Sequence, residues 1–223
     1  MNFKLFVESI IKYLCGVLLV GLLIFLPAGS INYFNGWLFM CLLFIPMFIA
    51  GIIMMVKDPD LLRRRLNAKE KEEEQKKVVL VSGLMFLTGF ILAGLNFRFN
   101  WLELPDVVVI ISSIIFLASY VLYGLILKQN TYLLRTIEVE KNQKLVDTGM
   151  YSIVRHPMYT ITVFLFLTMP LILGSILSFI VFLIYPFLII KRLNNEEKIL
   201  EKELKGYKEY QKKVKYKLIP FIW

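Results

Sequence analysis

The chain has 223 residues, a formal net charge of +9 and a hydrophobic content of 58%, with a mean hydropathy of +0.67. Soluble domains contain about 45–50% apolar residues, so this composition excludes an ordinary soluble domain and indicates a membrane protein. One histidine and two cysteines, Cys15 and Cys41, argue against zinc or haem, and no metal is expected. Both cysteines lie in apolar blocks and are predicted to be small buried hydrophobes.

Apolar blocks long enough to cross a bilayer recur along the chain. A span needs about 20 mostly apolar residues, and such blocks cover residues 10–26, 37–56, 78–95 and 107–127. The next block, 158–190, is too long for one span, and the Leu173-Gly174-Ser175 sequence after Pro170 favours a tight turn inside it. The sequence therefore predicts an all-α integral membrane protein with about six transmembrane helices, the last two forming a hairpin.

The basic residues are distributed unevenly between the two sides of this predicted bundle. Lys and Arg concentrate in segments 57–77, 128–157 and 191–223, whereas the opposite loops contain only Arg98. Because positively charged loops stay inside, we expect both termini to be cytoplasmic. The same distribution suits anionic headgroups, so membrane lipids are the expected partners and nucleic acid is not.

The C-terminal segment is expected to be an amphipathic helix. Between residues 194 and 214 the apolar and aromatic residues recur at three-four spacing; they are Leu200, Leu204, Tyr207, Tyr210 and Val214. Gly206 interrupts the pattern and can bend the helix. Two interpretations remain open: a helix that lies on the membrane surface, and a lid that packs against the bundle.

A cationic motif precedes the fifth predicted span. Pro157 suits the first turn of a helix, which places Arg155 and His156 at its N-terminus. Cations there oppose the helix dipole, so the position indicates either a functional site with an anion or side chains that reach for lipid phosphate.

A second polar group lies at the inner end of the sixth span. Arg192 and Glu196 are four residues apart and share a helix face. They form either an exposed pair of little energetic value or a binding site, in which Arg192 offers a planar fork to a carboxylate or phosphate and Glu196 holds an ammonium or hydroxyl group. Since both motifs flank one hairpin, we expect them to converge.

The two motifs together resemble the isoprenylcysteine carboxyl methyltransferase family, in its bacterial branch. The resemblance is carried by Gly149-x-Tyr151-x-x-Val154-Arg155-His156-Pro157-x-Tyr159, by Arg192-x-x-x-Glu196-Glu197, by Gly206-Tyr207-x-x-Tyr210-x-x-x-Val214 with Pro220, and by Asp58-Pro59-Asp60-Leu61-Leu62-x-Arg64. Met150 replaces the usual proline. Residues 1–56 match only as spans, so we divide the chain into a two-helix membrane region, 1–56, and a methyltransferase membrane domain, 57–223, with a cytoplasmic C-terminal cofactor-binding segment.

The resemblance implies a multi-pass enzyme of the cell membrane, of bacterial type, that uses S-adenosyl-L-methionine. Carried over residue by residue, the implied catalytic residues are Arg192, on the substrate side, and His156. The implied cofactor-binding residues are Glu140, Lys144, Leu145, Val146, Tyr151, His156, Pro157, Met158, Tyr159 and Glu196. Glu140 matches, across a gap, a position where the family has glutamine.

The physical chemistry of methyl transfer is compatible with these residues. Transfer from a sulfonium is an in-line displacement that depends mainly on alignment, so a carboxylate or thiolate acceptor needs no strong base. An amine would have to lose a proton, to His156 or Glu196. Membrane embedding suggests a lipophilic substrate that enters from the bilayer.

Several functions remain open at this point. Within the wider superfamily the acceptor could be a phospholipid amine or a small thiol instead of an isoprenylcysteine carboxylate. A membrane reductase of related architecture would use a nicotinamide cofactor. A transporter or scaffold is disfavoured because the predicted spans have no ionisable residue near their centres.

Overall fold

The computed structural model describes residues 3–66, 73–130, 132 and 143–223, and the regular structure in that part of the chain is helical. The long helices are α1 (Phe3–Ala28), α2 (Phe34–Lys57), α4 (Glu73–Phe99), α5 (Asp106–Gln129), α6 (Pro157–Ile172) and α8 (Tyr185–Glu203). The short elements are α3 (Pro59–Leu66), the 3-10 turn η1 (Gly149–Ser152), α7 (Ile176–Phe182) and α9 (Tyr207–Lys213). The predicted all-α fold is confirmed.

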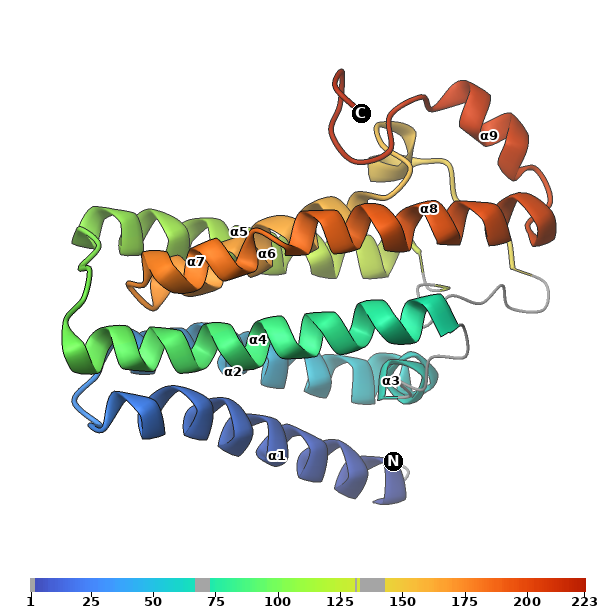
Figure 1. Cartoon of the computed structure of the whole chain (residues 1–223). Coiled ribbons are helices and arrows are strands. Elements are labelled where there is room, and N and C mark those ends of the chain that lie inside the picture. The colour runs from blue at the N-terminus through green and yellow to red at the C-terminus, as the bar shows by residue number, and fades with distance from the viewer. Residues whose placement is uncertain (1–2, 67–72, 131, 133–142) are drawn as a thin grey trace.

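The long helices run side by side in one bundle (Figure 1). Helix α4 contacts α1 as well as α7 and α8, and α5 packs along α6. The fully buried side chains of Ile24, Phe39, Phe116 and Phe182 belong to the shared core. A Cβ atom at Gly94 would lie 2.4 Å from the carbonyl oxygen of Ile24, so α1 and α4 meet at a contact that needs glycine.

The helices account for the predicted spans. Helices α1, α2, α4 and α5, together with the stretch Ile176–Glu203 that comprises α7 and α8, are long and apolar enough to cross a membrane. Helix α6 is also apolar but has only 16 residues, about 24 Å at 1.5 Å per residue. The prediction of about six spans is confirmed, with the last one built from two successive helices.

The hairpin inside residues 158–190 turns where the sequence predicts. Helix α6 ends at Ile172 and α7 begins at Ile176. The side chain of Ser175 accepts a hydrogen bond from the backbone N–H of Ser178 at 3.2 Å, which starts the new helix. Because the chain reverses here, the start of α6 and the end of α8 lie toward the same end of the bundle as the N-terminus (Figure 1). Which compartment that end faces stays a prediction.

Two expectations about local structure are wrong. The amphipathic segment 194–214 is not one helix: α8 ends at Glu203, Gly206 adopts a left-handed φ of +86°, and a separate helix α9 follows. The glycine ends the helix because this conformation costs it no Cβ clash. Cys15 and Cys41 are exposed rather than buried, because both lie on outward-facing helix surfaces, where lipid would contact them.

Candidate functional site

The backbone before α6 is fixed by the C-terminal segment of the chain. The N–H groups of Arg155 and His156 donate to the carbonyl oxygens of Tyr216 and Lys217 at 2.9 and 3.0 Å. His156 is the N-cap residue of α6, and Pro157 occupies the first turn as predicted. Two segments that are 60 residues apart in sequence therefore form one rigid platform at the start of the helix.

A buried ion pair joins this platform to α8. Arg155 Nε lies 2.7 Å from Glu197 Oε1, and both side chains are 7% exposed. Lys217 Nζ lies 2.9 Å from the other oxygen, Glu197 Oε2. The guanidinium also donates through Nη1 to the carbonyl oxygens of Val214 and Lys215 at 2.7 and 2.9 Å. The anion that compensates Arg155 at the helix N-terminus is therefore Glu197.

The single histidine of the chain lies at the centre of this network. His156 Nε2 is 3.3 Å from Glu197 Oε1 and 3.3 Å from the hydroxyl of Tyr207 on α9. Burial, and after it the negative charge of Glu197, raise the pKa of the Tyr207 phenol above its ordinary value. The phenol therefore stays protonated and can donate to Glu197 Oε1 at 3.4 Å.

A second chain of polar contacts extends from Tyr159. Its hydroxyl donates to Glu196 Oε2 at 2.5 Å and accepts from Arg192 Nε at 3.1 Å. Its ring stacks near the His156 ring, with centroids 5.8 Å apart. Arg192 and Glu196 are half-buried, unlike Glu197. The neighbouring glutamates of α8 thus differ: Glu197 is buried against cations, and Glu196 is partly accessible.

The remaining residues implied by the family resemblance surround this cluster. Leu145 packs against the apolar residues of the α8–α9 segment, with Leu200, Leu204, Tyr207, Tyr210 and Val214. Val146 and Met158 pack around Tyr151, whose carbonyl oxygen accepts a hydrogen bond from the Tyr210 hydroxyl at 2.7 Å. Pro157 is buried and Lys144 is exposed. Glu140 lies outside the described residues.

The contacts of Leu145 decide how the amphipathic segment packs. The apolar side of the amphipathic segment faces other residues of the protein, as in the lid interpretation.

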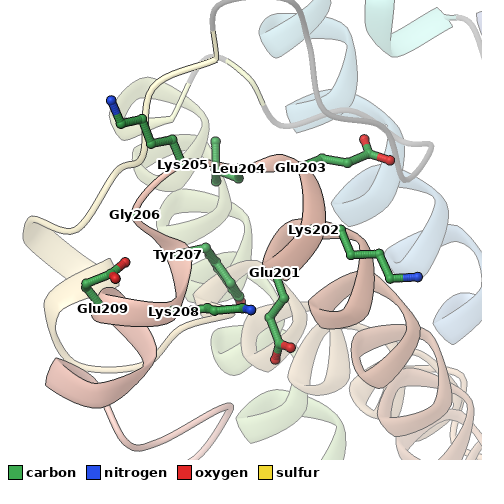
Figure 2. A pocket seen from close by; sticks show the side chains of 9 residues that line it. All are labelled: Glu201, Lys202, Glu203, Leu204, Lys205, Gly206, Tyr207, Lys208 and Glu209. Atoms are coloured by element: carbon green, nitrogen blue, oxygen red, sulfur yellow. The ribbon is translucent and has the colours of Figure 1, made fainter.

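An open pocket of about 320 Å³ lies at the turn between α8 and α9 and is lined by residues 201–209, with Tyr207 on its wall (Figure 2). A volume of about 300 Å³ is the lower end of the range for small-molecule sites. Through Tyr207, this pocket adjoins the His156 cluster.

Sequence reasoning did not select Glu197, Tyr207 or Lys217. The sequence could have indicated a role for Glu197, because a cation beside a helix N-terminus needs an anion and two consecutive glutamates lie on α8. No spacing pattern indicated Lys217, because its contacts depend on how the last ten residues fold back.

Residues 102–206 match the family model of phospholipid methyltransferases. The match covers just under half of the chain and includes His156, Tyr159, Arg192, Glu196 and Glu197. The matched family is part of the membrane methyltransferase superfamily, which includes the isoprenylcysteine carboxyl methyltransferases. No curated protein matches the chain.

In this protein the matched segment contributes both sides of the cluster, the start of α6 and the end of α8. Tyr207 and Lys217 come from the chain that follows the match. The C-terminal segment therefore completes an arrangement whose other groups lie within the shared family region.

Proposed function

We propose that this protein is a membrane methyltransferase that uses S-adenosylmethionine and transfers the methyl group to a lipophilic acceptor at the membrane surface. The observation that carries the proposal is the convergence of two polar motifs. His156 from the start of α6 and Glu197 from the end of α8 are in contact, and Tyr159 links Arg192 to Glu196 beside them.

The charges available in the cluster fit the proposed cofactor. When bound, S-adenosylmethionine supplies an activated methyl group on a positively charged sulfur. The ammonium or ribose hydroxyl groups of the cofactor suit the half-buried carboxylate of Glu196. Within the described residues this carboxylate accepts one hydrogen bond, from the Tyr159 hydroxyl to Oε2. The neighbouring rings of Tyr159 and His156 offer apolar surface for an adenine or a sulfonium.

The guanidinium of Arg192 and the position at which α6 begins indicate what kind of acceptor fits the cluster. Arg192 is half-buried, and its planar guanidinium suits an acceptor carboxylate. An already charged carboxylate needs alignment rather than a base. Because α6 starts beside His156, an acceptor with an apolar chain can lie in the bilayer while its polar end reaches the cluster. An isoprenylcysteine carboxylate has this form.

A phospholipid amine is the second candidate, and the family model that matches favours it. A protonated amine must lose a proton before it can attack. The His156–Glu197 contact of 3.3 Å offers a partner that could accept that proton.

The first test is cofactor binding to the full chain in lipid nanodiscs. We expect tritiated S-adenosylmethionine to bind at micromolar concentrations, the lower end of the range usual for enzyme substrates, and NADPH not to compete. Glu196→Gln should weaken binding at least about tenfold, a loss of about 1.4 kcal/mol.

Glu8→Gln is the control. Glu8 lies on α1, is exposed and accepts a hydrogen bond from Lys12 at 2.6 Å. We expect it to leave binding unchanged. Displacement by NADPH would favour the reductase, and the absence of binding by either nucleotide would contradict both enzymatic hypotheses.

The second test identifies the acceptor. Native membranes that contain the chain are incubated with the methyl-labelled cofactor, and the labelled material is separated into lipid, protein and volatile fractions. Base-labile label indicates a methyl ester on a carboxylate, and base-stable label in phospholipid indicates an N-methyl group.

A further inference from the structure

The last residues of the chain expose an unusual amount of apolar surface. Phe221 is 87% exposed and Ile222 is 76% exposed, and the side chains of Ile219 and Trp223 are exposed as well. These residues lie outside the helices that could cross the membrane. Exposing such side chains to water is unfavourable, and they form a contiguous stretch rather than scattered surface positions.

Backbone hydrogen bonds fold this stretch into a fixed hook, residues 219–223. Leu218 and Ile219 both donate to the carbonyl oxygen of Trp223 at 3.0 Å, and Trp223 donates back to Ile219 at 3.1 Å. Phe221 adopts a left-handed φ of +66°, a conformation that is costly for an aromatic residue. The hook therefore keeps a strained turn that directs apolar side chains outward.

The hook is tied to the start of a membrane span. The hydroxyl of Thr160, in the first turn of α6, donates to the carbonyl oxygen of Leu218 at 2.7 Å. Phe221 is three residues further on, within about 10 Å of that point at 3.3–3.6 Å per residue. Figure 1 shows the chain end beside the η1 turn, standing clear of the helices. The hook is therefore level with the end of α6 at which that apolar helix begins.

Basic residues precede the hook in the chain. Lys212 and Lys215 are exposed, and Lys217 Nζ lies 5.2 Å from the centroid of the Trp223 ring. Aromatic and aliphatic side chains flanked by lysines are the composition of segments that bind the membrane interface. Lysines near an anionic surface strengthen such binding.

We propose that the hook inserts into the headgroup–acyl boundary of the bilayer that holds the bundle, with Lys212 and Lys215 facing anionic headgroups. The bilayer then covers Phe221 and Ile222. It also holds the preceding residues, Lys217 and Leu218, against Glu197 and Thr160. Insertion of the hook depends on no assumption about methyl transfer.

The test uses the fluorescence of Trp223. The other tryptophans, Trp37 and Trp101, lie at the start of α2 and just after α4, so Trp37→Phe/Trp101→Phe leaves one reporter. The full chain is placed in phosphatidylcholine nanodiscs with or without phosphatidylglycerol. We expect a lipid with a spin label near the headgroup to reduce the emission by at least about half, and aqueous iodide to have little effect. Efficient quenching by iodide without quenching by the lipid label would overturn the proposal, and so would protection from both quenchers.

Variants of the hook sharpen the result. Phe221→Ser/Ile222→Ser should weaken quenching by the lipid label and increase quenching by iodide, while thermal stability in detergent is retained. Lys212→Gln/Lys215→Gln should remove the difference between anionic and neutral bilayers. Equal quenching of the unmodified hook in both bilayers would contradict the role assigned to the lysines. All these readouts are independent of cofactor binding.

Discussion

Replacing Glu197 by glutamine removes a buried negative charge while keeping the shape of the side chain. Arg155 Nε and Lys217 Nζ approach this carboxylate at 2.7 and 2.9 Å. Removing one partner of a buried ion pair costs roughly 3–5 kcal/mol, because the other charge stays in a low-dielectric environment. Two backbone carbonyl groups still accept hydrogen bonds from Arg155. We therefore expect the free energy of unfolding to fall by about 3 kcal/mol, the lower end of that range.

The adjacent substitution, Glu196→Gln, should behave differently. Glu196 is half-buried and accepts one hydrogen bond, from Tyr159, within the described residues. An amide oxygen can still accept that bond, so the expected loss of stability is below about 1 kcal/mol. The cost should instead be seen in cofactor affinity.

Thermal unfolding in one detergent compares the two variants directly. For chains of this length 1 kcal/mol corresponds to about 2–4 °C, so Glu197→Gln should lower Tm by roughly 6–12 °C and Glu196→Gln by less than about 4 °C. Adding Arg155→Met to Glu197→Gln should recover part of the loss, since no uncompensated guanidinium then remains. Equal Tm values for the two glutamine variants would refute the different roles assigned to these glutamates.

Other substitutions test the site and the bundle separately. His156→Ala should weaken binding of labelled S-adenosylmethionine by at least about tenfold, because the residue contacts both sides of the cluster; unchanged affinity would remove it from the site. Tyr207→Phe removes one hydroxyl hydrogen bond worth about 1 kcal/mol and should lower that affinity about fivefold, a result checked in the same assay. Gly94→Ala should lower the free energy of unfolding by roughly 1–3 kcal/mol, because its Cβ would meet the backbone of α1. Gly83→Ala on the same helix is the control, since a Cβ there has nothing within 4 Å, and equal effects of the two alanines would contradict the close contact.

Much of the fold follows from the sequence because bilayer spans have a strong compositional signal. Apolar runs located the long helices, and Gly174 with its neighbours located the hairpin turn. The spacing of Arg192 and Glu196 placed them on one helix face, and Tyr159 does contact both. These are local patterns, so periodicity and length are sufficient to predict them.

The details of the cluster could not be derived in this way. Whether Glu196 or Glu197 meets Arg155 depends on the rotation of α8 about its axis, which is set by packing against α4 and α6. The contacts of Lys217 depend on a long-range return of the chain with no periodicity. The break between α8 and α9 was visible as Gly206, but its consequence, a separate helix that carries Tyr207 to His156, required the tertiary structure.

Methyl transfer by the cluster that joins α6 to α8 can be measured in whole membranes. Membranes that contain the unmodified chain, and matched membranes with Glu196→Gln at equal abundance, are incubated with cofactor labelled in its methyl group. We expect label in a lipophilic fraction of the first membranes and at least about tenfold less label in the second. Equal label in both, or none above membranes that lack the chain, would contradict methyl transfer by this cluster.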